Sequence, residues 1–268
     1  MPRALLAVSL LALFAVPAAA QSHYAPPGDT VRYRWGVKTN VIVSTPQGEI
    51  PVNADQSGVV AMTRLPHDSA LVWFESLEIA ASTPAGEQKP STAELVGKPY
   101  RVAFSPSGRV HLGEAPTIPP ELEGMGDLRH VFDDFFLRLP AKPLTVGLAW
   151  SDTVARSDSS ADRWMRVGAV SEYRVERDTV VNGVAGVVVA MKEHVDIQAE
   201  NPVPNAPARG HTTLAGTDTG YFVFAPKAGR VLGRRHEGHF TGSMVLGAPA
   251  NMEMKQAIDI SATVDEVR

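Results

Sequence analysis

Strict alternation of apolar and polar residues is the feature that most limits what this chain can fold into. From Val31 to Lys38, apolar and aromatic residues take every second position, and arginine, glycine and lysine take the others. The same period of two returns over 165–175 and over 252–264. Side chains on a β-strand point alternately to opposite faces, so this pattern predicts long antiparallel strands with one face in a core and one in water.

Turn residues favour the same class of fold. Asn182-Gly183 separates two strand-like stretches, 176–181 and 184–189, and is the strongest short-range signal for a β-hairpin. The chain also carries 22 glycines and 21 prolines, which favours many reversals.

Two of the predicted reversals resemble each other. Residues 104–110 (FSPSGRV) and 224–231 (FAPKAGRV) both place a phenylalanine before a proline-started, glycine-closed turn, and a basic residue and valine after it. Ordinary hairpin chemistry explains this similarity as well as an internal duplication does. A duplication would make 30–115 and 160–266 two similar halves of the sheet.

Residues 126–139, between these halves, have helical periodicity instead. Their apolar residues recur three and four positions apart and predict one continuous stripe, with Asp127 in the first turn and Pro140 ending the helix. Two interpretations stay open: a helix packed on the sheet as ordinary core, or one that closes the mouth of a curved sheet and lines a ligand cavity. The stripe consists of Leu128, Val131, Phe132, Phe135, Phe136 and Leu139.

Together these patterns predict an all-β fold with one short amphipathic helix. We expect a single domain over 21–268, built as a large bent antiparallel sheet or an incomplete barrel. Its two similar halves remain the open alternative described above.

The first twenty residues predict a secretory signal peptide. Arg3 supplies a positive start, 4–16 is an apolar run with Ser9 as its one polar residue, and small residues precede Gln21. The run is shorter than the ~20 residues that a helix needs to cross a bilayer. We therefore expect cleavage after Ala20, no transmembrane span in the mature chain, and delivery to a bacterial periplasm or the medium.

Composition excludes several classes of function. The chain has no cysteine, which rules out disulfides, thiol catalysis and lipid attachment through a cysteine. The formal net charge of −4 argues against a nucleic-acid-binding protein, which usually has a basic excess. No glycine-rich phosphate loop is present, and we expect no cofactor.

Three short motifs resemble catalytic or metal sites without meeting their requirements. His236-Glu237-Gly238-His239 spaces its histidines three apart, so a strand would send them to opposite faces, and we expect no metal site there. Asp218-Thr219-Gly220 matches an aspartic-protease triplet, but that chemistry needs two carboxylates, so a turn is the simpler prediction. No Gly-x-Ser-x-Gly elbow exists, and no catalytic residue is predicted.

One stretch resembles a known group of proteins. Residues 135–140 (FFLRLP) are followed by 142–150 (KPLTVGLAW), and this is similar to exported bacterial β-rich proteins of a family of unknown function. The resemblance covers about residues 95–155 and implies a fold, with no catalytic residue to carry over. At the level of architecture alone, the predicted sheet is also similar to the half-barrels of periplasmic lipoprotein carriers, although no residue motif of those carriers is present.

The leading hypothesis for function is non-enzymatic binding of an apolar or amphipathic ligand, a lipid for example, or of an envelope component. Bent sheets leave a concave apolar face that side chains, a helix or a ligand must fill. The alternatives are a scaffold that binds a protein partner, and a hydrolase whose site the sequence does not reveal. The predicted ligand-contacting residues are Phe132, Phe135, Phe136, Tyr33 and Trp35.

Overall fold

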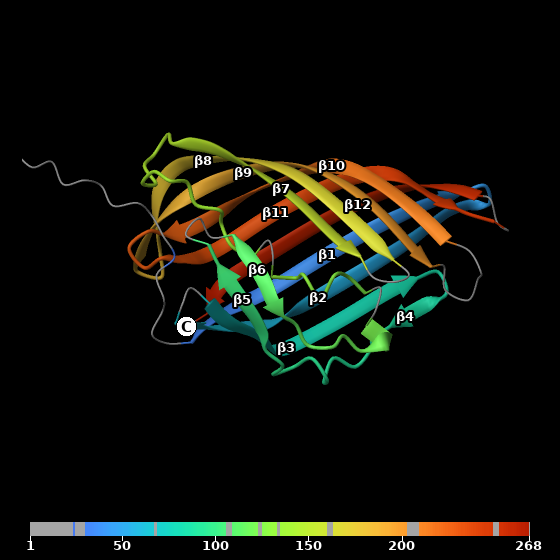
Figure 1. Ribbon diagram of the computed structural model, residues 1–268, viewed down its shortest axis with the longest axis horizontal. Coiled ribbons are helices and arrows are strands. Elements are labelled where there is room, and N and C mark those ends of the chain that lie inside the picture. The colour runs from blue at the N-terminus through green and yellow to red at the C-terminus, as the bar shows by residue number, and fades with distance from the viewer. Residues whose placement is uncertain are drawn as a thin grey trace, which may run out of the picture.

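The computed structural model is one large antiparallel β-sheet that curves around the segment 115–148 (Figure 1). It describes Tyr24 and residues 30–66, 69–105, 109–122, 125–132, 135–159, 163–202, 209–248 and 252–267. The predicted signal peptide lies outside these described residues. The strands are β1 (Val31–Thr45), β2 (Gly48–Leu65), β3 (Ser69–Thr83), β4 (Gly86–Gln88), β5 (Tyr100–Phe104), β6 (Val110–Glu114), β7 (Ala149–Ser159), β8 (Trp164–Val181), β9 (Val184–Pro202), β10 (Arg209–Ala225), β11 (Arg230–Leu246) and β12 (Met252–Val267).

The first and last long strands meet in the middle of the sheet. The order is β6-β5-β3-β2-β1-β12-β11-β10-β9-β8-β7, with β4 paired to the far end of β3. The edge strands β6 and β7 do not pair with each other in the part of the chain that the structure describes, so the sheet is open. The predicted all-β class, with a large bent antiparallel sheet, is therefore confirmed.

Glycines allow the strands to approach one another closely where the sheet bends. A methyl group at Gly242 would lie 1.9 Å from the carbonyl oxygen of Thr213, and one at Gly216 would lie 2.2 Å from that of His239. No side chain fits into such a space, and glycine within a strand often marks a tight bend. Gly216 and Gly242 point to the same face as the core residues of their strands.

We call the sheet face that carries the core the inner face. The core covers one half of this face. Alternate residues of paired strands share this face, so Trp35 on β1 lies beside Val264 on β12, and Phe222 on β10 beside Val189 on β9. All four side chains are buried. Arg34, on the outward side of β1, is exposed, as the alternation predicts, whereas the outward Val188 of β9 is buried.

The predicted hairpin is also confirmed. β8 and β9 are joined at Asn182 and Gly183, whose φ angles are 50° and 79°. Positive φ at both central residues is the type I′ geometry that an Asn-Gly pair favours, and its twist matches that of the strands.

The predicted amphipathic helix over 126–139 is wrong. The described residues of this range form turns and bends, and the described chain contains only a short 3-10 helix, Pro120–Leu122. Leu137, which a helix would place opposite the phenylalanine stripe, is fully buried. The turns close through i to i+3 bonds, as from the Phe135 amide to the Phe132 carbonyl.

Contacts with the strands explain why the helix does not form. The carbonyl of Leu128, which an α-helix would bond to the amide four residues later, accepts the hydroxyl of Tyr100 at 3.0 Å. The Gln56 amide on β2 donates to the Met125 carbonyl at 2.6 Å. Tertiary contacts thus override the local periodicity, in a segment rich in phenylalanine and aspartate, which are weak helix formers.

The predicted duplication stays a prediction. Its two turns join β5 to β6 and β10 to β11, with bonds from Ser105 to Arg109 and from Gly229 to Ala225 that close both hairpins. Residues 106–108 of the first turn lie outside the described residues. Within the described chain, no helix is long and apolar enough to span a membrane.

Candidate functional site

A row of polar side chains crosses the inner face where the packed core ends. Asp152 on β7 pairs in register with Ser171 on β8, Ser171 with Glu193 on β9, and Glu193 with Asp218 on β10. We call these four residues the polar row. The neighbours of the first three on the same face are apolar, as with Tyr173 and Ala169 on either side of Ser171, and those of Asp218 are glycines. Polar groups in such surroundings need partners, because burying an unpaired polar group is costly.

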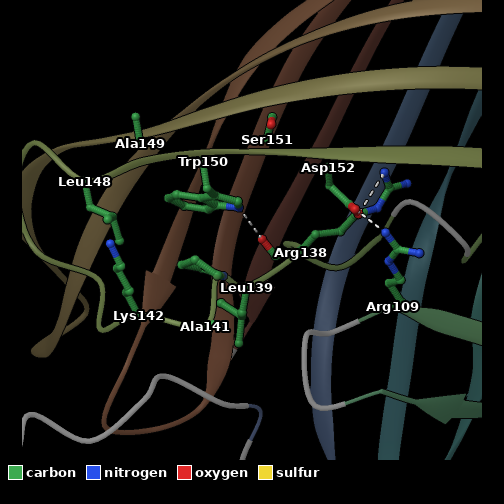
Figure 2. Close-up of a pocket in the computed structure, with 11 residues that line it drawn as sticks. Arg109, Arg138, Leu139, Ala141, Lys142, Leu148, Ala149, Trp150, Ser151 and Asp152 are labelled. Carbon is green, nitrogen blue, oxygen red and sulfur yellow. Dashed lines mark hydrogen bonds and ion pairs between the residues drawn. The ribbon is translucent and has the colours of Figure 1, made fainter.

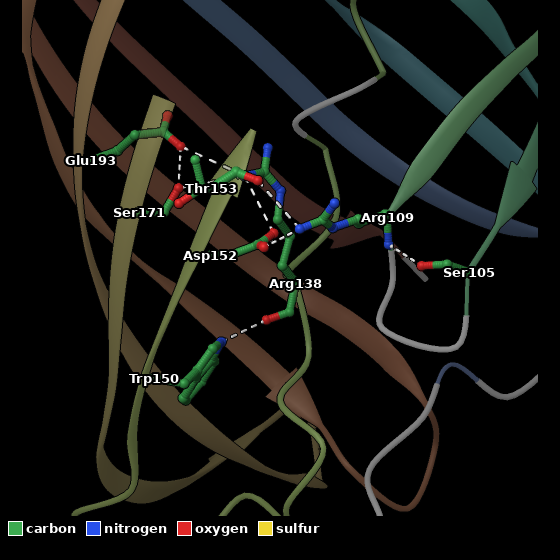
Figure 3. Close-up of polar contacts among 8 residues, drawn as sticks. All are labelled: Ser105, Arg109, Arg138, Trp150, Asp152, Thr153, Ser171 and Glu193. Carbon is green, nitrogen blue, oxygen red and sulfur yellow. Dashed lines mark hydrogen bonds and ion pairs between the residues drawn. The ribbon is translucent and has the colours of Figure 1, made fainter. Parts of the chain in front are cut away.

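Arg138, from the segment 115–148, supplies the cation for the polar row. Its guanidinium Nη1 lies 3.5 Å from the Ser171 hydroxyl, 3.8 Å from an Asp152 carboxylate oxygen and 3.9 Å from Glu193 (Figure 3). The Ser171 hydroxyl in turn donates to Glu193. The Arg138 side chain is only 11% exposed, so one buried cation stands between two carboxylates.

Arg109 brings a second cation from the opposite edge of the sheet. It precedes β6, and its guanidinium binds the Asp152 carboxylate and donates to the Thr153 carbonyl of β7 at 3.3 Å. Arg109 is 44% exposed, so it forms the outer, wet end of the cluster. Asp152 is therefore shared by one buried and one exposed arginine (Figure 3).

Asp218 and His236 form a neighbouring pair on the inner face. The His236 Nδ1 lies 2.5 Å from an Asp218 carboxylate oxygen, and both side chains are nearly buried. The prediction of a turn at Asp218 is wrong, because Asp218 lies inside β10, whose pairing with β11 continues past it. Gly220 allows β11 to approach β10 closely, because a methyl group at this position would lie 2.1 Å from the Arg235 carbonyl oxygen.

The two histidines of the His236–His239 motif point to opposite faces, as their odd spacing predicts. His239 lies on the outer face, where its Nδ1 is 2.7 Å from Asp259 and both side chains are 65% exposed. The described residues contain no group of three histidine, aspartate or glutamate side chains that could hold a metal ion.

Beyond the polar row, most inward side chains of β8 to β12, β1 and β2 are apolar, whereas on β7 Arg156 and Asp158 follow Val154 and pair with Asp127 and His130. The apolar side chains are only partly buried, and in the described chain they do not belong to the main core cluster. We call this surface the apolar extension. It consists of Val41, Val43, Val52, Val154, Met165, Val167, Val195, Ile197, Met244, Leu246, Met252, Met254, Ile258 and Ile260.

A cavity of about 520 Å³ lies at the β7 edge, beside the polar row (Figure 2). Its polar lining is Arg109, Arg138, Lys142 and Asp152, and Trp150 and Leu139 provide apolar wall. The Trp150 ring stacks on Tyr173 at 5.1 Å between centroids, and its indole N–H donates to the Arg138 carbonyl at 3.0 Å. These contacts fix the ring in the cavity wall.

The five ligand-contacting residues predicted from the sequence lie together, in the packed core. Each is at most 4% exposed, and Tyr33 stacks edge-on against Phe135 at 5.2 Å. Burial also raises the pKa of the Tyr33 hydroxyl. A cavity beside Phe136 holds only about 10 Å³, too little for more than one water. Ligand contact by Phe132, Phe135, Phe136, Tyr33 and Trp35 therefore stays a prediction.

Comparisons with known proteins leave the family open. No family model matches the chain, and no curated protein matches it. A solved structure of lipovitellin, described as showing lipid–protein interactions, is similar over 90% of this chain with 12% identity and a TM-score of 0.49, and the chain spans about a quarter (25%) of that protein. Neisserial surface protein A matches 88% of this chain and 97% of its own, with 8% identity and a TM-score of 0.25. OprB of Pseudomonas putida matches 87% and 92%, with 9% identity and a TM-score of 0.25. At these TM-scores we draw no function from the likeness.

Proposed function

We propose that this chain is exported through the signal in residues 1–20 and binds an apolar or amphipathic ligand, whose hydrocarbon chain lies on the apolar extension. The partial exposure of that surface is the observation that carries the proposal. On β12, the inward residues from Ile260 to Met252 are apolar except Gln256, whereas the outward residues include Glu253, Lys255 and Asp259. At about 3.4 Å per residue, this stretch of β12 is roughly 27 Å long.

The apolar extension needs a cover. Large apolar patches on soluble proteins mark binding sites, because their exposure to water is unfavourable. Four methionines contribute to this surface: Met165, Met244, Met252 and Met254. Methionine is unbranched and adaptable, and it is common where one surface accepts apolar partners of different shapes.

A lipid chain fits this surface better than a rigid protein partner does. The apolar extension continues the curved face that the core occupies, and the polar row lies at the junction between them. A lipid with one hydrocarbon chain would place the chain on the apolar extension and its polar end at the polar row. The scaffold alternative instead places a protein segment or a second copy of the chain there, and the test below separates these occupants.

The test compares two lysine substitutions on adjacent residues of β11. Met244 points to the inner face, and Val245 points outward and is 44% exposed. We expect Met244→Lys to weaken binding of 1-monolauroylglycerol at least tenfold, because the ligand would desolvate the ammonium group. Val245→Lys should bind like the unmodified protein. Isothermal titration calorimetry measures both, and native mass spectrometry of protein from its own host identifies co-purified lipid.

Either a failure of the binding test or a dimer at this surface would contradict the proposal. The first is equal loss of binding in both variants, or no binding of monolauroylglycerol by protein that has been stripped with organic solvent. The other is a dimer in native mass spectra that Met244→Lys dissociates and Val245→Lys does not, since a second copy would then occupy the surface.

A further inference from the structure

The cavity at the β7 edge has an excess of positive charge. Arg109, Arg138 and Lys142 line it together with one carboxylate, Asp152. Glu193 lies behind Arg138 at 3.9 Å, and with its charge counted the excess is still positive by one. Lys142 is exposed and forms no ion pair with a described residue. The cavity therefore favours an anionic group.

Asp152 favours a ligand that also donates a hydrogen bond. Its Oδ1 binds Arg109, whereas its Oδ2 is buried and, although 3.8 Å from Arg138, accepts no hydrogen bond from the described residues. Leaving a buried acceptor without a donor is costly, and a turn of the carboxylate toward the cavity would let a ligand hydroxyl donate to it. A simple carboxylate ligand has no such donor at neutral pH, but a polyol phosphate has hydroxyl groups beside its anion.

The position of the cavity connects it to the apolar extension. Asp152 and Val154 are alternate residues of β7 and share its inner face, so they lie about 7 Å apart along the strand. Trp150, on the other side of Asp152, forms apolar wall of the cavity. A ligand headgroup beside Asp152 thus lies one inward position from Val154. From there a hydrocarbon chain would continue across β8 and β9, because Arg156 and Asp158 follow Val154 on the inner face of β7. The cavity volume, about 520 Å³, is in the usual range for small-molecule sites.

We propose that this cavity binds a glycerol-phosphate group, with the phosphate on Arg109 and Lys142 and a hydroxyl donating to Asp152. Arg138 holds Asp152 in place from the buried side and adds positive charge. The free polyol phosphate and the headgroup of a single-chain phospholipid share this chemistry. The lipid form rests on the proposed function, whereas the headgroup site does not.

Three ligands separate these sources in calorimetric titrations of the full mature chain: glycerol 3-phosphate, 1-monolauroylglycerol and 1-lauroyl lysophosphatidic acid. We expect the lysophosphatidic acid to bind at least tenfold more tightly than monolauroylglycerol, with an affinity that falls as sodium chloride is raised. Lys142→Gln should remove most of this difference and leave monolauroylglycerol binding unchanged. Because Lys142 is exposed and forms no ion pair with a described residue, the substitution should leave the fold intact. Lys192→Gln, on the exposed outer face of β9, is the matched control and should change nothing.

The outcomes distinguish the headgroup site from the proposed function. Equal affinity for the two lauroyl compounds, or no effect of Lys142→Gln on the lysophosphatidic acid, overturns the headgroup site alone. Binding of glycerol 3-phosphate that Lys142→Gln abolishes, without binding of monolauroylglycerol, supports the headgroup site with a free ligand and overturns the proposed function. Absence of binding by all three ligands overturns both.

Discussion

Arg109 and Asp152 join the two edges of the open sheet. Arg109 lies at the start of β6, Asp152 lies on β7, and these strands are at opposite ends of the strand order. The same guanidinium donates to the Thr153 carbonyl, which belongs to the unpaired side of β7. This one arginine therefore links the edge strands at a single point, whereas a row of backbone hydrogen bonds links them in a closed sheet.

Removing this contact should loosen the edges without unfolding the protein. Because Arg109 is 44% exposed, we expect Arg109→Gln to lower the free energy of unfolding by less than about 1 kcal/mol. Amide hydrogen exchange should nevertheless become faster in β6 and at residues 149–153, since local opening needs less energy there. Hydrogen-exchange mass spectrometry measures this directly.

Arg32→Gln provides the control for the edge contact. Arg32 is 50% exposed and binds both oxygens of Glu75 at 3.0 and 2.9 Å, away from the edge pair. It should cost a similar small amount of stability and leave exchange at 149–153 unchanged. Equal exchange profiles for the two variants would show that Arg109 does not hold the edges together.

The turn structure of 126–139 makes a clear prediction for Leu137. Its side chain is fully buried, so Leu137→Ala should lower the free energy of unfolding by about 2–5 kcal/mol in urea titrations. Val131→Ala, at a half-buried position of the predicted stripe, should cost less. A helix would reverse this order, because it would expose Leu137 and bury Val131.

Much of the fold can be predicted from local sequence, whereas the conformation of 126–139 cannot. The alternation around Tyr33 and the turn at Asn182 act through neighbouring residues only, so both predictions are confirmed by the structure. The conformation of 126–139 depends on Tyr100, which bonds the Leu128 carbonyl, and on Gln56, which bonds the Met125 carbonyl just before the segment. The hydrophobic periodicity of the segment contains no information about these distant partners.

The residues of the polar row are visible in the sequence as breaks in the apolar alternation, but the alternation alone does not predict that they lie together. Ser171 and Glu193 each interrupt a series of inward apolar residues, and they lie opposite each other only because a bulge at Glu176 shifts the register of the Asn182 hairpin by one residue. Asp152 and Asp218 belong to the same row only through the register of β7 on β8 and of β10 on β9, which the sequence did not predict. Arg138 lies outside the apolar stripe of the predicted helix, and its contact with Ser171 depends on the conformation that the segment actually adopts.

Buried tyrosines predict how stability changes at alkaline pH. Burial raises the pKa of Tyr100, and the negative charge of Asp127 raises it further. The folded state therefore keeps the proton that the unfolded state loses near pH 10, so this contribution is complete below about pH 10 and is lost as the pH rises above it. We expect urea titrations to show a fall in stability above pH 10.

Tyr100→Phe isolates this effect. At pH 7 the variant should lose about 0.5–1.5 kcal/mol, because the Leu128 carbonyl loses its 3.0 Å hydrogen bond. Above pH 10 the difference from the unmodified protein should become smaller, since phenylalanine does not ionise. Tyr221→Phe, at a position that is 42% exposed, should show neither change. A difference that is constant with pH would contradict the predicted shift.

Glycine at 242 should be required for both stability and ligand binding. A methyl group there would lie 1.9 Å from the Thr213 carbonyl oxygen, so Gly242→Ala must push β10 and β11 apart and should cost about 1–3 kcal/mol in urea titrations. Gly168→Ala is the control, because no atom lies within 4 Å of the added methyl group, and its effect should stay within about 0.5 kcal/mol. Gly242 also lies beside Leu214 on the face that carries the apolar extension, so its substitution should weaken binding of 1-monolauroylglycerol, whereas Gly168→Ala should not. If Gly242→Ala loses stability but binds the ligand unchanged, the curvature at this point serves the fold and not the site.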